Sequence, residues 1–85
     1  MTLDNNQVVQ LRNGICGIVT SFNNKPCQLV FSAYTNPVSR YDENLKHKNS
    51  QYDIVKVFDG SSIENPKQVF SKKFDPTSLP IVWSE

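Results

Sequence analysis

Side chains that could bind an anionic aromatic ligand are concentrated in one polar segment of the chain. Arg40 and Tyr41 are adjacent there, and Tyr34 and Lys48 bound the segment. A tyrosine ring can stack on a nucleotide base, and an arginine fork binds phosphate through charge-assisted hydrogen bonds. Adjacent side chains diverge in a strand but can converge in a loop. The segment therefore predicts a ligand-binding loop centred on Arg40 and Tyr41. The residues predicted to support them are Tyr34, Lys48 and the distant Arg12.

A purely structural interpretation of the same segment stays open. Tyr41 and Leu45 would then pack the loop onto the rest of the domain, and the charged side chains would be solvated. Asp42 and Glu43 favour this interpretation, because they interrupt the basic character of the segment. Arg12, which lies beside a turn, would then be an exposed turn residue.

The chain offers little support for catalysis or for a bound metal. It contains no Gly-x-Ser-x-Gly motif, no Walker loop and no His-Glu-x-x-His zinc motif. His47 is the only histidine, so a zinc site is not expected. We therefore expect a non-enzymatic protein without a cofactor. A formal net charge of +1, from nine Lys and Arg against eight Asp and Glu, argues against a polybasic nucleic-acid binder.

The elements that must position these residues are predicted to be short strands. Valine, asparagine and serine each occur nine times and alanine once, a composition typical of strands joined by turns. The 85 residues fit a single domain, 1–85, and one helical turn is expected near 65–71. The fold is predicted to be all-β, a small antiparallel SH3-like barrel of five or six short strands. The expected strands are 8–11, 15–22, 27–34, 52–59 and 81–83, with 69–70 as a sixth candidate.

Two hairpins would set the register of the first three strands. Asn13-Gly14 predicts a type I′ turn, in which both central residues have positive φ. Pairing around Asn23-Asn24 places residue 18 opposite residue 29. The side chains on the core face would then be Cys16, Ile18, Thr20, Cys27, Leu29 and Phe31. Those on the opposite, mixed face would be Gly17, Val19, Ser21, Gln28, Val30 and Ser32.

Both cysteines and the single tryptophan are expected to be core residues. In the register above, Cys16 and Cys27 lie roughly 13 Å apart along the strands, too far for a disulfide. Trp83 is expected in the core because tryptophan is heavily buried on average. The exposed edges and mixed face of so small a sheet favour a homo-oligomer, most simply a two-fold dimer that buries Val19 or Val30.

The sequence leads us to expect no targeting or membrane segment. Residues 1–7 lack the basic and apolar regions of a signal peptide, and no stretch approaches 18 consecutive apolar residues. Two cysteines are too few for a disulfide scaffold. We therefore expect an intracellular protein that contacts no membrane.

Four short motifs occur together in a way that resembles a family. They are Leu11-Arg12-Asn13-Gly14, Tyr41-Asp42-Glu43-Asn44-Leu45, the strand from Tyr52 to Phe58, and Val82-Trp83. In this combination the chain is similar to a group of small single-domain β proteins encoded by phages and prophages of Firmicutes. It departs from their pattern at Asn44, where the loop motif has aspartate, and at Phe58, where the strand motif has tyrosine. The resemblance implies a phage origin and a location in the host cytoplasm.

A small phage protein without catalytic motifs is expected to act by binding. The preferred interpretation is a counter-defence protein that sequesters a nucleotide-derived host immune signal without cleaving it. A second interpretation is a protein inhibitor that docks on a host CRISPR effector or nuclease. A third is a small nucleic-acid-binding module, which would need a continuous basic stripe. The expected partner is therefore a nucleotide-like small molecule or a host defence protein.

Overall fold

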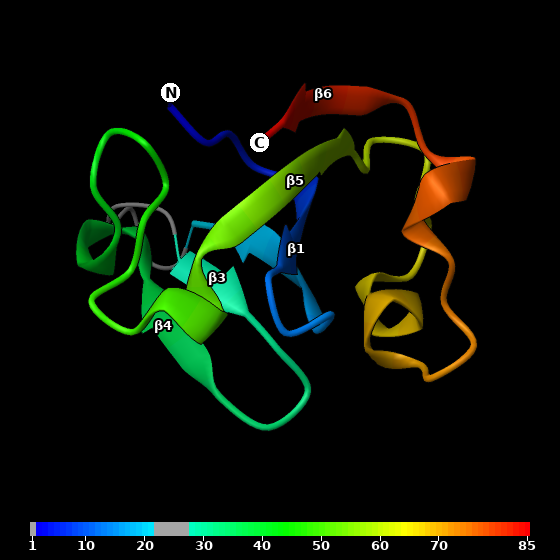
Figure 1. Cartoon of the computed structure of the whole chain (residues 1–85). Helices are drawn as coiled ribbons and strands as arrows, with labels where there is room; N and C mark the ends of the chain where they lie inside the picture. Colours follow the sequence, from blue (N-terminus) through cyan, green and yellow to red (C-terminus); the bar gives the residue numbers. More distant parts are fainter. Residues whose placement is uncertain (1, 22–27) are drawn as a thin grey trace.

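Six strands of the described residues form one antiparallel sheet, which stays open between its two edge strands. The computed structural model describes residues 2–21 and 28–85 (Figure 1). The strand order is β4-β3-β2-β1-β5-β6, so β4 and β6 are the edges. The all-β, barrel-like fold is confirmed. The strands are β1 (Gln7–Leu11), β2 (Cys16–Thr20), β3 (Gln28–Val30), β4 (Thr35–Pro37), β5 (Ile54–Asp59) and β6 (Ile81–Ser84).

The β1–β2 hairpin is confirmed, but its predicted turn type is wrong. The Leu11 N–H donates to the Ile15 carbonyl at 2.9 Å, which leaves three residues in the connection. Of these three, only Gly14 has a positive φ, at 91°. A three-residue connection that ends on a left-handed glycine is the next most common hairpin solution after the two-residue turns. Asn13 has another role, because its side-chain oxygen accepts a hydrogen bond from the Ile15 N–H at 3.0 Å.

The predicted register between β2 and β3 is wrong by one residue. Val19 lies opposite Leu29, and Ile18 lies opposite Val30. The core face of this pair therefore carries Val19 and Leu29, both 0 % exposed. Ile18 is also buried, at 3 %, because the opposite face of β2 is covered as well. When both faces of a strand are buried, its apolar pattern no longer distinguishes one register from the next.

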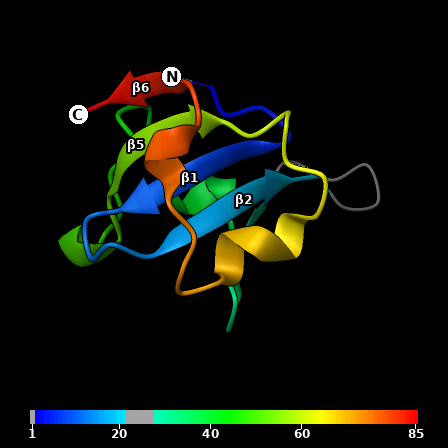
Figure 2. The ribbon, with the colours of Figure 1, turned by 90° about the vertical axis from the view of Figure 1, so that its right-hand side faces the viewer.

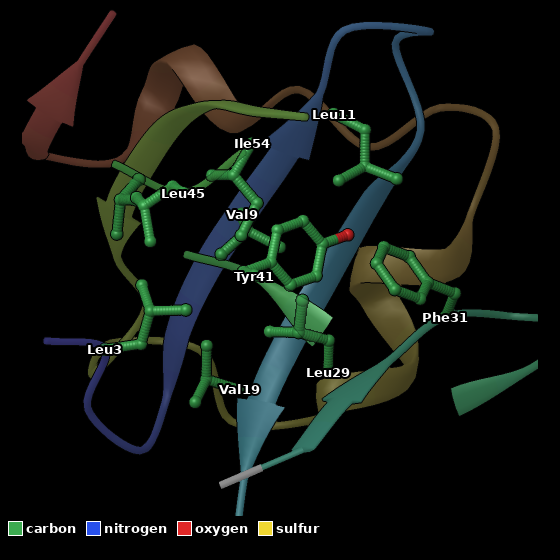
Figure 3. Close-up of a cluster of buried hydrophobic side chains, with 10 residues drawn as sticks. Leu3, Val9, Leu11, Val19, Leu29, Phe31, Tyr41, Leu45 and Ile54 are labelled. Atoms are coloured by element: carbon green, nitrogen blue, oxygen red, sulfur yellow. The ribbon is translucent and has the colours of Figure 1, made fainter. Parts of the chain in front are cut away.

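Two separate groups of apolar side chains fill the two sides of the sheet. Trp83 is half-buried and packs against the first group, as expected of a core-facing residue. The second group is covered by residues 60–80, which cross the sheet without forming a strand (Figure 2). The buried members of the first group are Leu3, Val9, Leu11, Val19, Leu29, Phe31, Tyr41, Leu45, Ile54 and Val57 (Figure 3). Those of the second are Val8, Phe58 and Val69.

Four short 3-10 helices connect the described strands, where the sequence predicted only one helical turn. The predicted turn is present as η3 (Pro66–Phe70), and the Asn65 side chain caps it by accepting from the Lys67 N–H at 3.1 Å. The additional helices are η1 (Val38–Arg40), η2 (Ser50–Tyr52) and η4 (Pro76–Ser78). Among the described residues, no helix has the length and apolar character that crossing a membrane requires.

Cys16 is a free, half-buried cysteine at the edge of the second apolar group. Burial raises the pKa of its thiol, which disfavours the reactive thiolate. The position expected for Cys27 and the turn expected at Asn23-Asn24 fall in 22–27, outside the described residues.

Candidate functional site

The polar segment after β4 is a tightly organised turn rather than an irregular loop. Tyr41 and His47 form an antiparallel bridge, and the chain reverses between them. The Asp42 carboxylate organises the reversal by accepting from the N–H groups of Asn44 at 2.8 Å and Lys46 at 3.0 Å. Leu45 adopts a positive φ of 61° and is only 2 % exposed. A leucine in this backbone region is strained, so its buried side chain must hold the turn in place.

Tyr41 is part of the core. Its side chain is 9 % exposed, and its hydroxyl donates a hydrogen bond to the Tyr52 carbonyl at 3.0 Å. Burial raises the pKa of Tyr41 to about 12. Figure 3 shows its ring among the first group of core side chains. Tyr41 thus takes the packing position of the structural interpretation, as does Leu45.

A hollow opens beside this turn and is walled mainly by aromatic rings. Its volume is about 290 Å³. The Tyr34 ring is held by stacking on Phe31, with ring centroids 4.9 Å apart. The His47 ring meets Tyr52 edge-on at 5.4 Å and Tyr41 at 5.3 Å. The residues that line the hollow are Tyr34, Asn36, Arg40, His47 and Tyr52.

Among the described residues, Arg40 is the one permanent cation that lines this hollow, and no carboxylate lines it. Within 2–21 and 28–85, every ion pair involves Arg12 or Lys46, so the Arg40 guanidinium has no internal counter-ion. An unpaired guanidinium beside aromatic faces can bind a flat anionic ligand.

The polar atoms around Arg40 are mainly hydrogen-bond donors to a ligand. His47 Nδ1 accepts from the Asn49 N–H at 2.9 Å, so the neutral ring carries its proton on Nε2. The Tyr34 hydroxyl has its pKa raised by burial and by the neighbouring Tyr52 phenol, which keeps it protonated. The Asn36 side chain is half-buried at the wall and adds an amide that can donate and accept.

The structure separates the five residues that the sequence grouped into one site. Tyr34 and Arg40 line the hollow, whereas Tyr41 lies in the core beneath it. Lys48 is exposed and does not line the hollow. Arg12 belongs to another group of side chains, which we call the charge cluster: Arg12, Lys46, Asp53 and Glu85.

The charge cluster joins distant parts of the chain through short contacts. Arg12 lies 2.7 Å from Glu85 and 3.4 Å from Asp53, and Lys46 Nζ lies 2.9 Å from Glu85. Hydrogen bonds from Lys46 and Arg12 lower the pKa of Glu85, and the Glu85 carboxylate raises that of Arg12. Asp53 is only 5 % exposed, and its other oxygen accepts from the His47 N–H at 2.7 Å. Asp53 therefore connects the charge cluster to the wall of the hollow.

Sequence reasoning missed three of the residues that line the hollow. The sequence does not place the single histidine, His47, in the predicted ligand-binding set, and it predicts Tyr52 in a strand that in fact begins at Ile54. Asn36 lies on β4, a strand that was not predicted. The feature of the sequence that could have placed His47 is Asp42. Its carboxylate accepts from the Lys46 N–H and so stabilises the chain reversal that brings His47 beside Tyr41.

No family model, curated protein or solved structure matches the chain. The geometry of the described residues is therefore the basis for functional inference. The described fold and hollow define a small open β sheet with an aromatic, singly cationic cavity at one side.

Proposed function

We propose that this protein is a non-enzymatic binding protein whose hollow holds a nucleotide-like ligand. The observation that supports this most directly is Arg40, which has no carboxylate partner in the part of the chain that the structure describes and lies beside the rings of Tyr34, His47 and Tyr52. A ring of the ligand would stack on the tyrosines, and its phosphate would bind Arg40. Stacking on an aromatic side chain contributes about 1–3 kcal/mol per base, and charge-assisted hydrogen bonds to phosphate are stronger than neutral ones.

The size of the hollow favours one nucleotide unit. Small-molecule pockets usually span about 300–1,000 Å³, and the hollow of about 290 Å³ is slightly smaller than that range. One cation matches one phosphate group. A larger signalling nucleotide would therefore place one base and one phosphate in the hollow and extend beyond it.

The biological role we propose is counter-defence by sequestration in the cytoplasm of a bacterial host. Its support is the resemblance of the motifs Leu11–Gly14 and Tyr41–Leu45 to those of small phage proteins, together with a hollow suited to a nucleotide-derived signal. Sequestration needs tight binding without chemistry. Stacking, one charge-assisted contact and fixed hydrogen-bond donors supply binding of that kind.

The test is calorimetric titration of the protein with a panel of AMP, GMP, CMP and UMP. We expect at least one to bind, and Arg40→Ala to lower its affinity by about tenfold or more with an unchanged melting temperature. Lys48→Ala is the matched control, because Lys48 is a cation of the same segment that does not line the hollow. Absence of binding across the panel, or equal affinity of Arg40→Ala and the unaltered protein, would overturn the proposal.

We also propose that two copies associate through β6. Ile81 and Val82 are 58 % and 46 % exposed on this edge strand, and the strand carries no charged residue. An uncharged apolar edge invites pairing with a second strand. The predicted use of Val19 at the interface is wrong, because Val19 is 0 % exposed in the core.

Light scattering at tens of micromolar protein tests the association. We expect a dimer that Val82→Lys converts to a monomer. Ile15→Lys, which introduces the same charge at a 44 % exposed isoleucine of the β1–β2 turn, should remain dimeric. A monomeric unaltered protein would overturn this proposal without affecting the hollow.

A further inference from the structure

A second and larger hollow lies in the segment that covers the other apolar group of the sheet. Its volume is about 490 Å³, and we call it the 62–79 groove. Residues 34–52 and 60–80 lie at opposite sides of the molecule in Figure 1, so the groove is separate from the hollow beside Arg40. The residues that line the groove are Ser62, Ile63, Gln68, Ser71, Lys73, Phe74, Asp75, Ser78 and Leu79.

The groove has an apolar floor and a lining without net charge. Ile63, Phe74 and Leu79 are half-buried and pack against the second apolar group, so each leaves part of its surface exposed. The two charged side chains of the lining, Lys73 and Asp75, have opposite signs. Neither takes part in an ion pair between described residues, so both charges are available to a docking partner.

An exposed isoleucine lies beside the groove on the same face of the sheet. Ile81 of β6 is paired with Phe58 of β5, and residues directly opposite each other on paired strands point to the same face. Phe58 belongs to the second apolar group, against which the floor of the groove packs. Ile81 is 58 % exposed, it lies on an edge strand, and one residue separates it from Leu79.

A projecting apolar side chain next to an apolar groove makes this surface complementary to a second copy of itself. In a two-fold dimer every contact occurs twice, so one side chain of each copy can fill the groove of the other. Two identical faces repel each other when their charges have one sign. The balanced lining avoids this repulsion, because Lys73 of each copy can meet Asp75 of the other.

We propose that Ile81 of each copy is seated in the 62–79 groove of a second copy, with Lys73 paired to Asp75 across the interface. The inference rests on the association through β6 proposed above, and it is independent of the nucleotide hollow. Docking covers Ile81, Phe74 and Leu79, which a single copy leaves partly exposed. Removal of apolar surface from water is the main driving force of most protein association.

The first test measures the dimer dissociation constant by light scattering over a range of protein concentrations. Ile81→Ser should raise this constant by about tenfold or more, because it removes the apolar side chain that fills the groove. Ile15→Ser makes the same substitution at a 44 % exposed isoleucine of the β1–β2 turn, and it should dimerise as the unaltered protein does.

The second test exchanges the charges of the groove. Lys73→Asp gives each copy two carboxylates there and Asp75→Lys gives two lysines, so each variant alone should have a dissociation constant raised by about tenfold or more. An equimolar mixture should form heterodimers, because unlike charges then meet at both contacts. Lys48→Asp changes an exposed lysine that does not line the groove, and it should leave the dimer intact.

The outcomes separate this inference from the association on which it rests. A monomeric unaltered protein overturns both. A dimer that Val82→Lys dissociates, but that Ile81→Ser and Lys73→Asp leave intact, retains the association through β6 and overturns docking in the groove. Absence of heterodimers in a mixture of folded variants also overturns it. Asp75→Lys removes the acceptor of the Thr77 N–H, so its melting temperature is measured as well, and if it is unfolded Ile81→Ser and Lys73→Asp decide.

Discussion

The two arginines of the chain lie in different surroundings. Arg12 is ion-paired with carboxylates of the protein, whereas Arg40 lines the hollow. Arg12 lies 2.7 Å from Glu85 and 3.4 Å from Asp53, so carboxylates of the protein itself compensate its charge. Arg40 has no such partner among the described residues and faces a hollow with aromatic walls. An arginine can bind an external anion only when internal carboxylates do not already satisfy it. The comparison therefore gives Arg12 a structural role and leaves Arg40 as the arginine of the binding site that we propose.

The two regions also depend on each other. Asp53 binds the charge cluster through one oxygen and the His47 N–H through the other, at 2.7 Å. His47 in turn packs its ring against Tyr52 at the hollow. The charge cluster thus helps to position His47, one of the residues that line the hollow.

Removing the shared residue should have the largest effect on stability. Asp53→Ala leaves the half-buried His47 N–H without its acceptor and Arg12 without one carboxylate, and we expect a loss of about 2 kcal/mol in the free energy of unfolding. Asp53→Asn retains an acceptor oxygen and should lose less. Urea unfolding measures both variants. Equal losses would mean that the charge of Asp53, rather than its hydrogen bond, matters most.

Alanine substitutions of the two arginines should produce opposite results. Arg12→Ala should lower the melting temperature and leave nucleotide affinity unchanged, because its carboxylate partners lie outside the hollow. Arg40→Ala should weaken nucleotide binding by about tenfold or more and leave the melting temperature unchanged. Thermal unfolding of both variants measures the melting temperature, and calorimetric titration measures the nucleotide affinity. A loss of affinity in Arg12→Ala with native stability would abolish the distinction between the two regions.

Tyr41 should make stability fall at high pH. Its pKa is raised by burial to about 12, whereas an unfolded tyrosine ionises near its ordinary pKa of about 10. Both states hold the proton below pH 10, and between these two values only the unfolded chain releases it. The free energy of unfolding should therefore decrease from about pH 10 to about pH 12.

Tyr41→Phe separates this effect from those of the other tyrosines. It removes the hydrogen bond to the Tyr52 carbonyl, which should cost about 1 kcal/mol at neutral pH, and it should also flatten the decline at alkaline pH. Urea unfolding at pH 9 and pH 11 tests both effects. An equally steep decline in the variant would contradict a buried, ionisable Tyr41.

Glu85 should have the smallest effect, and it should appear in acid. Hydrogen bonds from Lys46 and Arg12 lower its pKa in the folded state, so its contribution is present above its ordinary pKa and is lost as pH falls through the lowered value. Because the cluster is exposed at this end, the effect should be slight and should weaken further in salt. Melting temperatures measured at pH 7 and pH 3 test this. Between these pH values the melting temperature should fall less in Glu85→Gln than in Glu64→Gln, which changes a glutamate outside the cluster.

Local signals were sufficient for several elements. Asn13-Gly14 indicated a hairpin, Asn65-Pro66 indicated η3, and the apolar run before Glu85 indicated β6. Each of these depends on residues that are neighbours in the chain, because turn and cap preferences are set by local φ and by side chains that bond a nearby N–H group. Tyr34 and Arg40 were also identified by type alone as residues able to recognise an aromatic anion.

The register and the composition of the hollow were decided by contacts between distant residues. Ile18 and Val19 are both apolar and both buried, so their side-chain types do not determine which of them lies opposite Leu29, and only the strand pairing of the folded chain does. In the same way, Arg12 and Arg40 are identical in type, and only folding placed carboxylates beside the first. Residue types and their local order were enough to predict an all-β chain and several of its turns. Tertiary structure decided which of those residues were satisfied internally, because burial and ion pairing depend on segments that the chain brings together only when it folds.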